Sequence, residues 1–335
     1  MKYPFVSIII PVRAINDYIR ESVPKHLALD HPNFEIIILP DKYEGGAGFE
    51  NDVRIIPTHP KTGPADKRDI GAKAAKGNIL AFIDDDAYPR RDWLKNAAPY
   101  FEEEKIAGVC GPGVTPPGDN MFKKVSGWVS ASLLGGGNVT HRFLPKEKRE
   151  VDDYPSMNLL IRKKDYDAVG GYDSHYWPGE DTKLCLDLTH RLGKKIVYDP
   201  EVLVYHHRRD IFVPHLRQNG RYGQHRGYFA KALPETSLRL AYFVPSLFTL
   251  FLFLTPVVAL VVKVLQLSTI YLLLSTVYYL LNAIYLLLLL ATAVWVYKHE
   301  RDWRIALLTI PAIIITHVWY GIKFIQGLLS DELAR

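Results

Sequence analysis

The apolar positions of the chain follow two different patterns. In the first part, short runs rich in Val and Ile recur between stretches that mix polar and apolar residues. These runs are FVSIII at 5–10, FEIIIL at 34–39, VRIIP at 53–57 and NILAFI at 78–83. Such runs, separated by helical stretches such as 66–76, are typical of a mostly parallel sheet covered by helices on both faces. The pattern predicts an α/β domain whose ligands bind at the strand ends.

The end of the chain contains much longer apolar runs. Residues 240–265 include one charge, Lys263; residues 268–297 include none; residues 305–329 include one, Lys323. At ~1.5 Å of rise per residue, each run can cross a hydrocarbon layer of roughly 30 Å. Three uninterrupted runs of this length disfavour the alternative of buried helices in a soluble core. We therefore predict three transmembrane helices at these positions.

Charged residues are concentrated ahead of the apolar runs. The chain holds 41 Lys and Arg against 36 Asp and Glu, a net charge of +5. Charges of both signs in near balance do not favour a nucleic acid partner. We divide the chain into a soluble domain at 1–207, a basic interfacial segment at 208–239 and a transmembrane domain at 240–335.

The basic residues near the apolar runs predict an orientation. Seven precede the first run: Arg208, Arg209, Arg217, Arg221, Arg226, Lys231 and Arg239. The connection at 266–268 has no charge, whereas Lys298, Arg301 and Arg304 follow the second run. Because Lys and Arg near a membrane favour the cytoplasmic side, the soluble domain should be cytoplasmic and the C-terminus outside. Two cysteines without disulfide or zinc spacing agree with a reducing compartment.

The strongest local chemical signal is Asp84-Asp85-Asp86, directly after the apolar run 78–83. Three adjacent carboxylates repel one another and need a counter-charge. Oxygen ligands at a strand end suit Mg²⁺ or Mn²⁺ carrying a diphosphate. Taken alone, such a triplet is more often a solvated turn or a helix N-cap, and its position directly after an apolar strand makes a metal site an equal alternative.

Several segments in order resemble the catalytic domain of glycosyltransferase family 2. They are SIIIPVRAIND at 7–17, GPADKRDIGAKAAKGNILAFIDDDAYP at 63–89, SMNLLIRKKDYDAVGGYD at 156–173 and GEDTKLCLDLTHRLGKKIVYDPEVLVYHH at 179–207. The resemblance runs from about Val6 to Gly227 and implies a GT-A nucleotide-diphospho-sugar transferase fold with C-terminal transmembrane helices. Residues 1–207 would then form the catalytic domain.

The resemblance also implies roles for individual residues. On the side of the nucleotide and its phosphates it suggests Pro11, Asp41, Lys67, Arg68, Asp84 and Arg221. Asp86 and His206 resemble metal ligands, and a neutral imidazole suits Mn²⁺. On the acceptor side it suggests Glu180, Gln218 and Tyr222, where Tyr222 replaces the Trp of the family's QxxRW motif. A basic helix that binds lipid headgroups is the other interpretation of that segment.

Asp181 resembles the general base of inverting members of the family. The segment starting at Gly179 has Leu184, Leu188 and Leu192 on one helical face, so Asp181 should lie in a first helical turn. The partial positive charge there favours an ionised carboxylate, the form that accepts a proton. Acidic residues in a first turn can also simply stabilise the helix.

The resemblance implies an inverting, metal-dependent hexosyltransferase, and the basic residues near the apolar runs place it at the cytoplasmic face. It would use a nucleotide sugar, with UDP expected from family frequency, and a lipid-linked or membrane acceptor hydroxyl. One alternative is a polyprenyl-phosphate glycosyltransferase, whose anionic acceptor needs no base. A second is a catalytically silent nucleotide-binding scaffold on the membrane, against which the carboxylates at 84, 86 and 181 argue.

Overall fold

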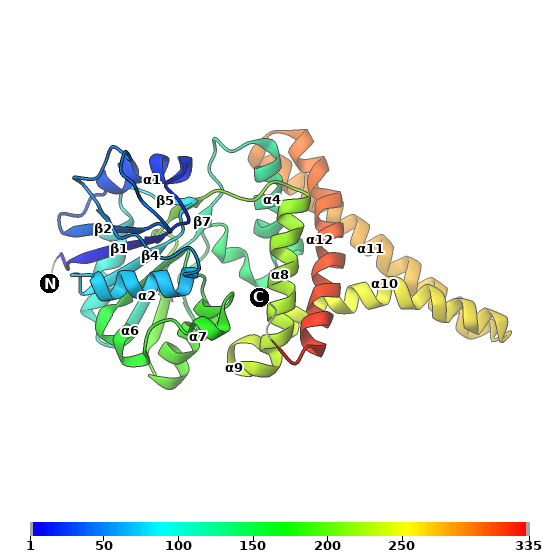
Figure 1. Ribbon diagram of the computed structural model, residues 1–335. Helices are drawn as coiled ribbons and strands as arrows, with labels where there is room; N and C mark the ends of the chain where they lie inside the picture. Colours follow the sequence, from blue (N-terminus) through cyan, green and yellow to red (C-terminus); the bar gives the residue numbers. More distant parts are fainter. Residues whose placement is uncertain (1–2, 333–335) are drawn as a thin grey trace. The chain divides into compact units, whose positions relative to one another are not determined.

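The computed structural model describes residues 3–332 and divides into two compact units (Figure 1). Among the described residues, the first comprises 3–117 together with 141–207. The second comprises 118–140 together with 208–332. Each unit has its own hydrophobic cluster, so each is described separately.

The first unit is built on an eight-stranded sheet in the order β3-β2-β1-β4-β9-β6-β10-β8. The strands are β1 (Val6–Pro11), β2 (Phe34–Leu39), β3 (Arg54–Ile55), β4 (Ile79–Ile83), β6 (Ile106–Cys110), β8 (Arg149–Val151), β9 (Asn158–Arg162) and β10 (Lys195–Tyr198). The four runs predicted as strands form β1 to β4, which are parallel to one another. The sheet is mixed rather than mostly parallel, because β9 enters between β4 and β6 and runs antiparallel to both. The predicted α/β class is confirmed.

Helices and a second, smaller sheet complete this unit. The helices are α1 (Asp17–Leu27), α2 (Pro64–Ala74), α3 (Trp93–Ala97), α6 (Lys163–Val169) and α7 (Glu180–Leu186), with short turns η1 (Ala98–Glu102), η3 (Ser174–Tyr176) and η4 (Asp187–Arg191). The small sheet has the order β5-β11-β7, formed by β5 (Ala87–Pro89), β11 (Val204–His206) and β7 (Gly113–Val114). It joins residues that follow β4 to residues near 206.

The core of the first unit explains why these segments become central strands. Ile8, Ile9 and Ile10 of β1 are buried at successive positions, as are residues 36–39 of β2 and 79–83 of β4. Burial on both faces of the sheet matches continuous apolar runs, whereas a half-exposed strand would alternate. The polar side chains that follow each run are therefore held on a rigid edge.

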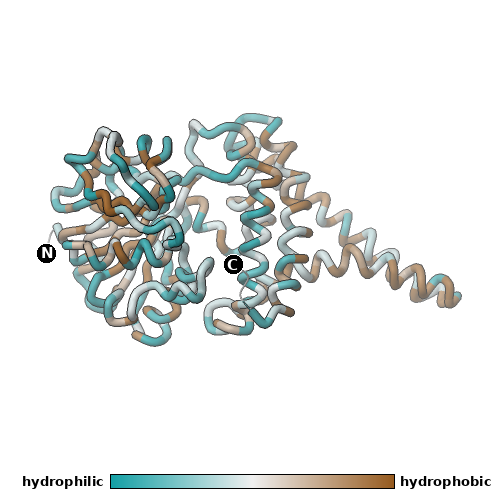
Figure 2. Tube along the Cα trace, in the orientation of Figure 1, coloured by the Kyte–Doolittle hydropathy of each residue, from teal (hydrophilic) through white to brown (hydrophobic). Residues whose placement is uncertain are grey.

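The second unit is entirely helical in the part of the chain that the structure describes. Its helices are α4 (Met121–Ala131), α5 (Leu133–Gly136), α8 (Val213–Ala232), α9 (Pro234–Ser237), α10 (Leu240–Val264), α11 (Ser268–Glu300) and α12 (Trp303–Leu329), with the turn η2 (Gly137–Arg142) at its boundary. Of these, α10, α11 and α12 are long and apolar enough to cross a membrane. Figure 2 shows how strongly apolar α10 and α11 are along their length.

Residues 118–140 pack with the C-terminal helices, which the sequence patterns did not indicate. Val125 and Val129 of α4 belong to one cluster with Ile305 and Ile313 of α12. Trp128 Nε1 donates to Glu300 Oε1 at the end of α11, at 3.1 Å. A segment between two strands of the first unit thus becomes part of the helical unit.

Candidate active site

Three of the predicted site residues lie at or just after the ends of neighbouring parallel strands, at the same edge of the main sheet. Pro11 ends β1, Asp41 follows β2, and Asp84 follows β4. Because β1 pairs in parallel with both β2 and β4, their carboxyl ends meet at one edge. This is the position where open α/β sheets bind ligands.

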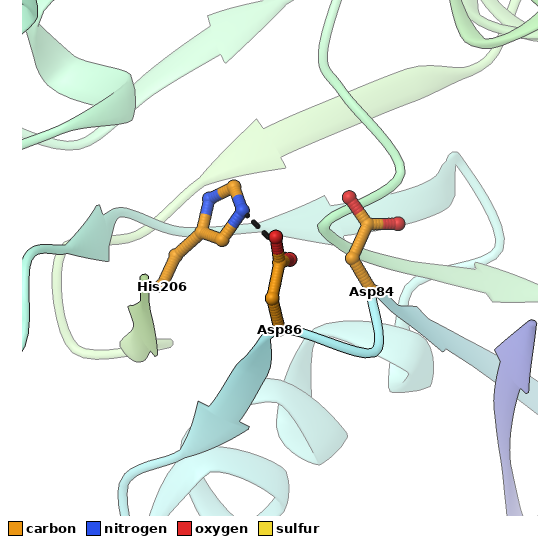
Figure 3. Close-up of side chains that lie close together, drawn as sticks. All are labelled: Asp84, Asp86 and His206. Carbon is orange, nitrogen blue, oxygen red and sulfur yellow. Dashed lines mark ion pairs between the residues drawn. The ribbon is translucent and has the colours of Figure 1, made fainter. Parts of the chain in front are cut away.

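Asp84, Asp86 and His206 form a cluster at this edge (Figure 3). Antiparallel pairing of β5 with β11 sets His206 opposite Ala87 and so brings the imidazole beside Asp86. His206 Nε2 lies 3.0 Å from Asp86 Oδ1. One ligand atom from each of the three residues lies within 4.8 Å of the others.

The donor atoms of this cluster fit a divalent cation. Two carboxylates and one imidazole match the mixed oxygen and nitrogen ligands that Mn²⁺ accepts. Asp86 is almost fully buried, with a side chain 5% exposed, whereas that of Asp84 is 32% exposed. The cluster is therefore buried at Asp86 and accessible to solvent at Asp84.

Asp85, the middle residue of the acidic triplet, forms a hydrogen bond with Asn16. Asp85 Oδ2 accepts a hydrogen bond of 2.9 Å from Asn16 Nδ2. Asn16 also caps α1, because its Oδ1 accepts from the backbone N–H of Ile19. Asp85 therefore ties the triplet to the start of α1, while its two neighbours form the cluster with His206.

Arg68 of α2 connects the acidic triplet to the start of α7. One guanidinium nitrogen donates to Asp84 Oδ1 and another to Glu180 Oε1, both at 2.8 Å. Burial alone would lower the pKa of Arg68, but neighbouring carboxylates, Asp84 first, raise it above its usual value. The guanidinium is thus held in the charged form between two carboxylates. Its predicted contact with phosphate stays a prediction.

Lys67, the neighbour of Arg68, is also engaged with protein groups. Its ammonium donates to the carbonyl oxygen of Val12 and forms an ion pair with the Asp41 carboxylate. Lys67 is buried at 3% exposure. The pair fixes Asp41 beside the end of β1, and the roles of both residues at the nucleotide stay predictions.

The first turn of α7 contains both predicted acidic residues. Glu180 Oε2 accepts from the backbone N–H of Gly179, and Asp181 Oδ1 accepts from that of Thr182, at 2.9 and 2.8 Å. Glu180 is buried, whereas Asp181 is partly exposed. Glu180 therefore holds Arg68, and Asp181 is the more accessible carboxylate of the turn.

The residues of the QxxRW-like segment belong to the second unit. Arg221 and Tyr222 lie on the exposed face of α8, and Gln218 Nε2 donates to the Tyr222 hydroxyl at 3.2 Å. Their part in the active site stays a prediction.

Tyr172 is a site residue to which the sequence patterns gave no role. The guanidinium carbon of Arg68 lies 5.5 Å from the centre of its ring. Its hydroxyl is bonded to the Ser156 hydroxyl at 2.7 Å, and burial raises its pKa well above the usual value. Tyr172 therefore stays neutral and packs its ring against the guanidinium of Arg68. The only signal in the sequence is its place in the GGYD segment that precedes α7.

Comparison with known proteins shows which family and which fold the chain resembles. Residues 7–170 match the model of glycosyl transferase family 2. The fold resembles that of a mannosyltransferase from Pyrobaculum calidifontis solved with GDP-mannose and Mn²⁺, at a TM-score of 0.52 and 17% identity, over 95% of this chain and 88% of that one. Residues 7–170 are therefore similar to a glycosyltransferase family 2 domain, in a GT-A-like fold that is followed by three long apolar helices.

Relatives with curated names share this domain. A pre-mycofactocin glycosyltransferase of Mycobacterium tuberculosis is 26% identical over 70% of this chain, which spans about half (49%) of that protein. A glucosyl-dolichyl phosphate glucuronosyltransferase of Haloferax volcanii is 22% identical over 60% of this chain and 68% of its own length. A dolichyl-linked sugar glucuronosyltransferase of Methanococcus voltae is 24% identical over 67% of this chain and 73% of its own.

Proposed function

We propose that the protein is an inverting glycosyltransferase that moves a sugar from a nucleoside diphosphate to a lipid-linked acceptor hydroxyl. The observation that carries the proposal is the cluster of Asp84, Asp86 and His206 at the end of β4 in a family 2 domain. Two relatives named for dolichyl-linked sugars support a lipid-linked acceptor. The apolar helices, with basic residues before and between them, support catalysis at the cytoplasmic face of a membrane.

Asp84, Asp86 and His206 would hold Mn²⁺ or Mg²⁺ together with the donor diphosphate. Bound there, the cation supplies positive charge that stabilises the leaving nucleoside diphosphate. Arg68 neutralises part of the charge on Asp84 and holds it against α2. Asp41 and Lys67 fix the edge beside the predicted nucleotide site.

Asp181 is proposed to accept the proton of the acceptor hydroxyl. Its bond to the Thr182 N–H fixes the direction of the carboxylate. Proton removal makes the hydroxyl oxygen a stronger nucleophile toward the anomeric carbon, while the diphosphate leaves from the opposite face. A single displacement of this kind inverts the configuration.

We propose a nucleoside diphosphate sugar as the donor and do not assign its nucleobase. Family frequency favours UDP, whereas the fold relative was solved with GDP-mannose. Purified full-length protein should release free UDP or GDP from one of a panel of donors when Mn²⁺ and a polyprenyl-linked sugar are added. Absence of acceptor-dependent release across UDP- and GDP-sugars would contradict the proposal and favour the silent scaffold.

A polyprenyl phosphate acceptor is the second candidate. A phosphate oxygen is already anionic, so it needs no general base. With a hydroxyl acceptor, Asp181→Asn should lower turnover by roughly 10²–10⁴-fold. Nearly unchanged turnover of Asp181→Asn with polyprenyl phosphate, together with no activity on the sugar-linked lipid, would select this second candidate.

A further inference from the structure

Helix α12 has two distinct faces. Its buried residues are Ile305, Ala306, Thr309, Ala312, Ile313, Thr316, Gly321, Phe324 and Gly327. Its large exposed apolar residues are Trp303, Leu307, Ile315, Trp319, Ile322 and Leu329. The exposed residues recur at intervals of three or four residues or sums of these, so they form one stripe along the helix. A helix with lipid on most sides needs no such division.

The second half of α12 is covered by α8, which runs beside it in the same direction (Figure 1). His215 Nε2 lies 2.9 Å from Thr316 Oγ1 near the start of the contact. Lys231 Nζ donates to the carbonyl oxygen of Ser330, at 2.7 Å, near its end. In between, a Cβ added to Gly227 would come within 2.1 Å of the Phe324 carbonyl oxygen. The two backbones are therefore in close contact over this length.

The first half of α12 is covered by α4. Val125 and Val129 pack in one cluster with Ile305 and Ile313. Lys124 Nζ of α4 pairs with Glu300 Oε2, just before α12, at 3.2 Å. The two halves of the buried face of α12 are thus covered by α4 and α8, and both of these helices carry cationic side chains.

Helix α8 is too charged to enter hydrocarbon. It carries four permanent cations in 15 residues: Arg217, Arg221, Arg226 and Lys231. Charged side chains within the hydrocarbon layer are strongly unfavourable. Since α8 lies along α12 from Thr316 to Ser330, this half of α12 must stay at the same level as α8, at the boundary with water.

Helices α10 and α11 are covered by protein over a smaller part of their length than α12. They contact each other through ring pairs such as Phe251 with Tyr278. The start of α10 and the end of α11 also pack on α12, because Ser246 Oγ donates to the carbonyl oxygen of Gly321 at 3.2 Å and Leu289 belongs to one cluster with Ile313. Beyond these contacts the two helices project as an apolar hairpin (Figure 2). In their most apolar windows only 6% and 17% of residues are buried, against 39% for α12. Most of their surface is left for lipid.

We infer that only α10 and α11 cross the membrane, and that α12 lies along the bilayer surface with its exposed stripe in the boundary between headgroups and acyl chains. Trp303, which is 63% exposed, is the residue type that collects at this boundary. Trp319 lies at the border of the stripe, with its indole against Gly220 of α8. Arg304, which is exposed, and Lys323, which is half-buried with its Nζ 5.2 Å from the Trp319 ring centre, supply cations for lipid phosphates. The C-terminus would then lie on the same side as α8, instead of on the outer side expected from three spans.

Labelling of single cysteines tests this topology in the full chain. Ser268→Cys at the α10–α11 connection, Lys298→Cys before α12 and Asp331→Cys after it are expressed in a bacterial inner membrane. Both native cysteines are buried and should stay unlabelled. A membrane-impermeant maleimide should label position 268 from one side only, and positions 298 and 331 only from the other. Labelling of 331 from the same side as 268 would overturn the inference.

Depth measurements with spin labels test the orientation of α12 itself. The labelled variants are Leu307→Cys, Ile315→Cys and Ile322→Cys, with Leu287→Cys on the exposed face of α11 as the control. In lipid vesicles, collision with oxygen and with a water-soluble nickel complex should give the three α12 sites one shallow depth and the control a much greater one. A spanning α12 would separate Leu307 and Ile315 by ~12 Å of depth, and that result would contradict the inference.

Discussion

The two units of the chain distribute charged and apolar side chains in opposite ways. In the first unit, Arg68 and Lys67 are buried against carboxylates, and the exterior is polar. In the second, Leu272 and Leu287 are 67% and 65% exposed, while Thr309 and Thr316 are buried. The first arrangement suits water, where apolar groups are hidden. The second suits lipid, where polar groups are satisfied inside the protein.

The first prediction tests whether the first unit depends on its buried charges. Arg68→Leu leaves Glu180 buried without its cation, so the free energy of unfolding should fall by about 3–5 kcal/mol. The matched control is Arg54→Leu, because Arg54 also pairs with a carboxylate, that of Glu35, but is 39% exposed. Its loss should stay under about 1 kcal/mol. Equal losses in thermal or denaturant unfolding would show that burial of the pair does not matter.

The second prediction concerns activity at the same edge of the sheet. Asp86→Asn removes a charge from the cluster of Asp84, Asp86 and His206 that is proposed to bind the cation, so turnover should fall by roughly 10²–10³-fold. Asp85→Asn is the control, because Asp85 binds Asn16 instead of joining the cluster, and it should retain most of the turnover. Initial rates of nucleoside diphosphate release measure both. A larger loss of turnover for Asp85→Asn would mean that Asp85, rather than Asp86, is the residue on which activity depends.

The third prediction concerns the close contact of α8 and α12 in the second unit. Gly227→Ala places a methyl group against the Phe324 carbonyl oxygen, which must move, so stability should fall by about 1–3 kcal/mol. Gly118→Ala is the control, because no atom lies within 4 Å of its added Cβ. Thermal unfolding in detergent should distinguish the two. An unchanged midpoint for Gly227→Ala would mean that the helices are not in close contact.

The fourth prediction uses a buried histidine of the first unit. Burial lowers the pKa of His26 to about 4, against 6.5 in an unfolded chain. Between these values the unfolded chain binds more protons, so acidification favours unfolding. The wild type should therefore lose about 2 kcal/mol from this residue between pH 7 and pH 5.

Variants on α1 separate this effect from general destabilisation. His26→Gln should lose less stability on acidification than the wild type. Ser22→Ala, at a buried position on the same helix that does not titrate, should keep the wild-type pH dependence. Denaturant unfolding at the two pH values gives the comparison. Identical pH dependence in all three proteins would exclude His26 as the source.

Features carried by contiguous sequence could be predicted, and features carried by distant contacts could not. The strands β1 to β4 and the three apolar helices appear as uninterrupted runs, so their positions were evident within a few residues. The proximity of His206 to Asp86 was expected only through family resemblance, since it depends on the pairing of β5 with β11.

The partners of Arg68 show the limit of the patterns more clearly. Glu180 is 112 positions away, and no local pattern indicates that one guanidinium binds both Glu180 and Asp84. The same holds for α4, whose packing against α12 depends on a contact between residues near 125 and near 310. Hydropathy predicts that α12 is long and apolar enough to cross a membrane, and the structure agrees. Hydropathy does not record that α8 covers one face of α12, which is the contact on which its proposed position at the bilayer surface rests.

The central claim is that Asp84, Asp86 and His206 bind the divalent cation that carries the donor diphosphate. Pulsed electron paramagnetic resonance of Mn²⁺ bound to the full chain with UDP or GDP tests it most directly. The spectrum should show coupling to a histidine nitrogen that disappears in His206→Gln and persists in Asp85→Asn. Mn²⁺ bound without nitrogen coupling in the wild type, or with coupling unchanged in His206→Gln, would contradict the account.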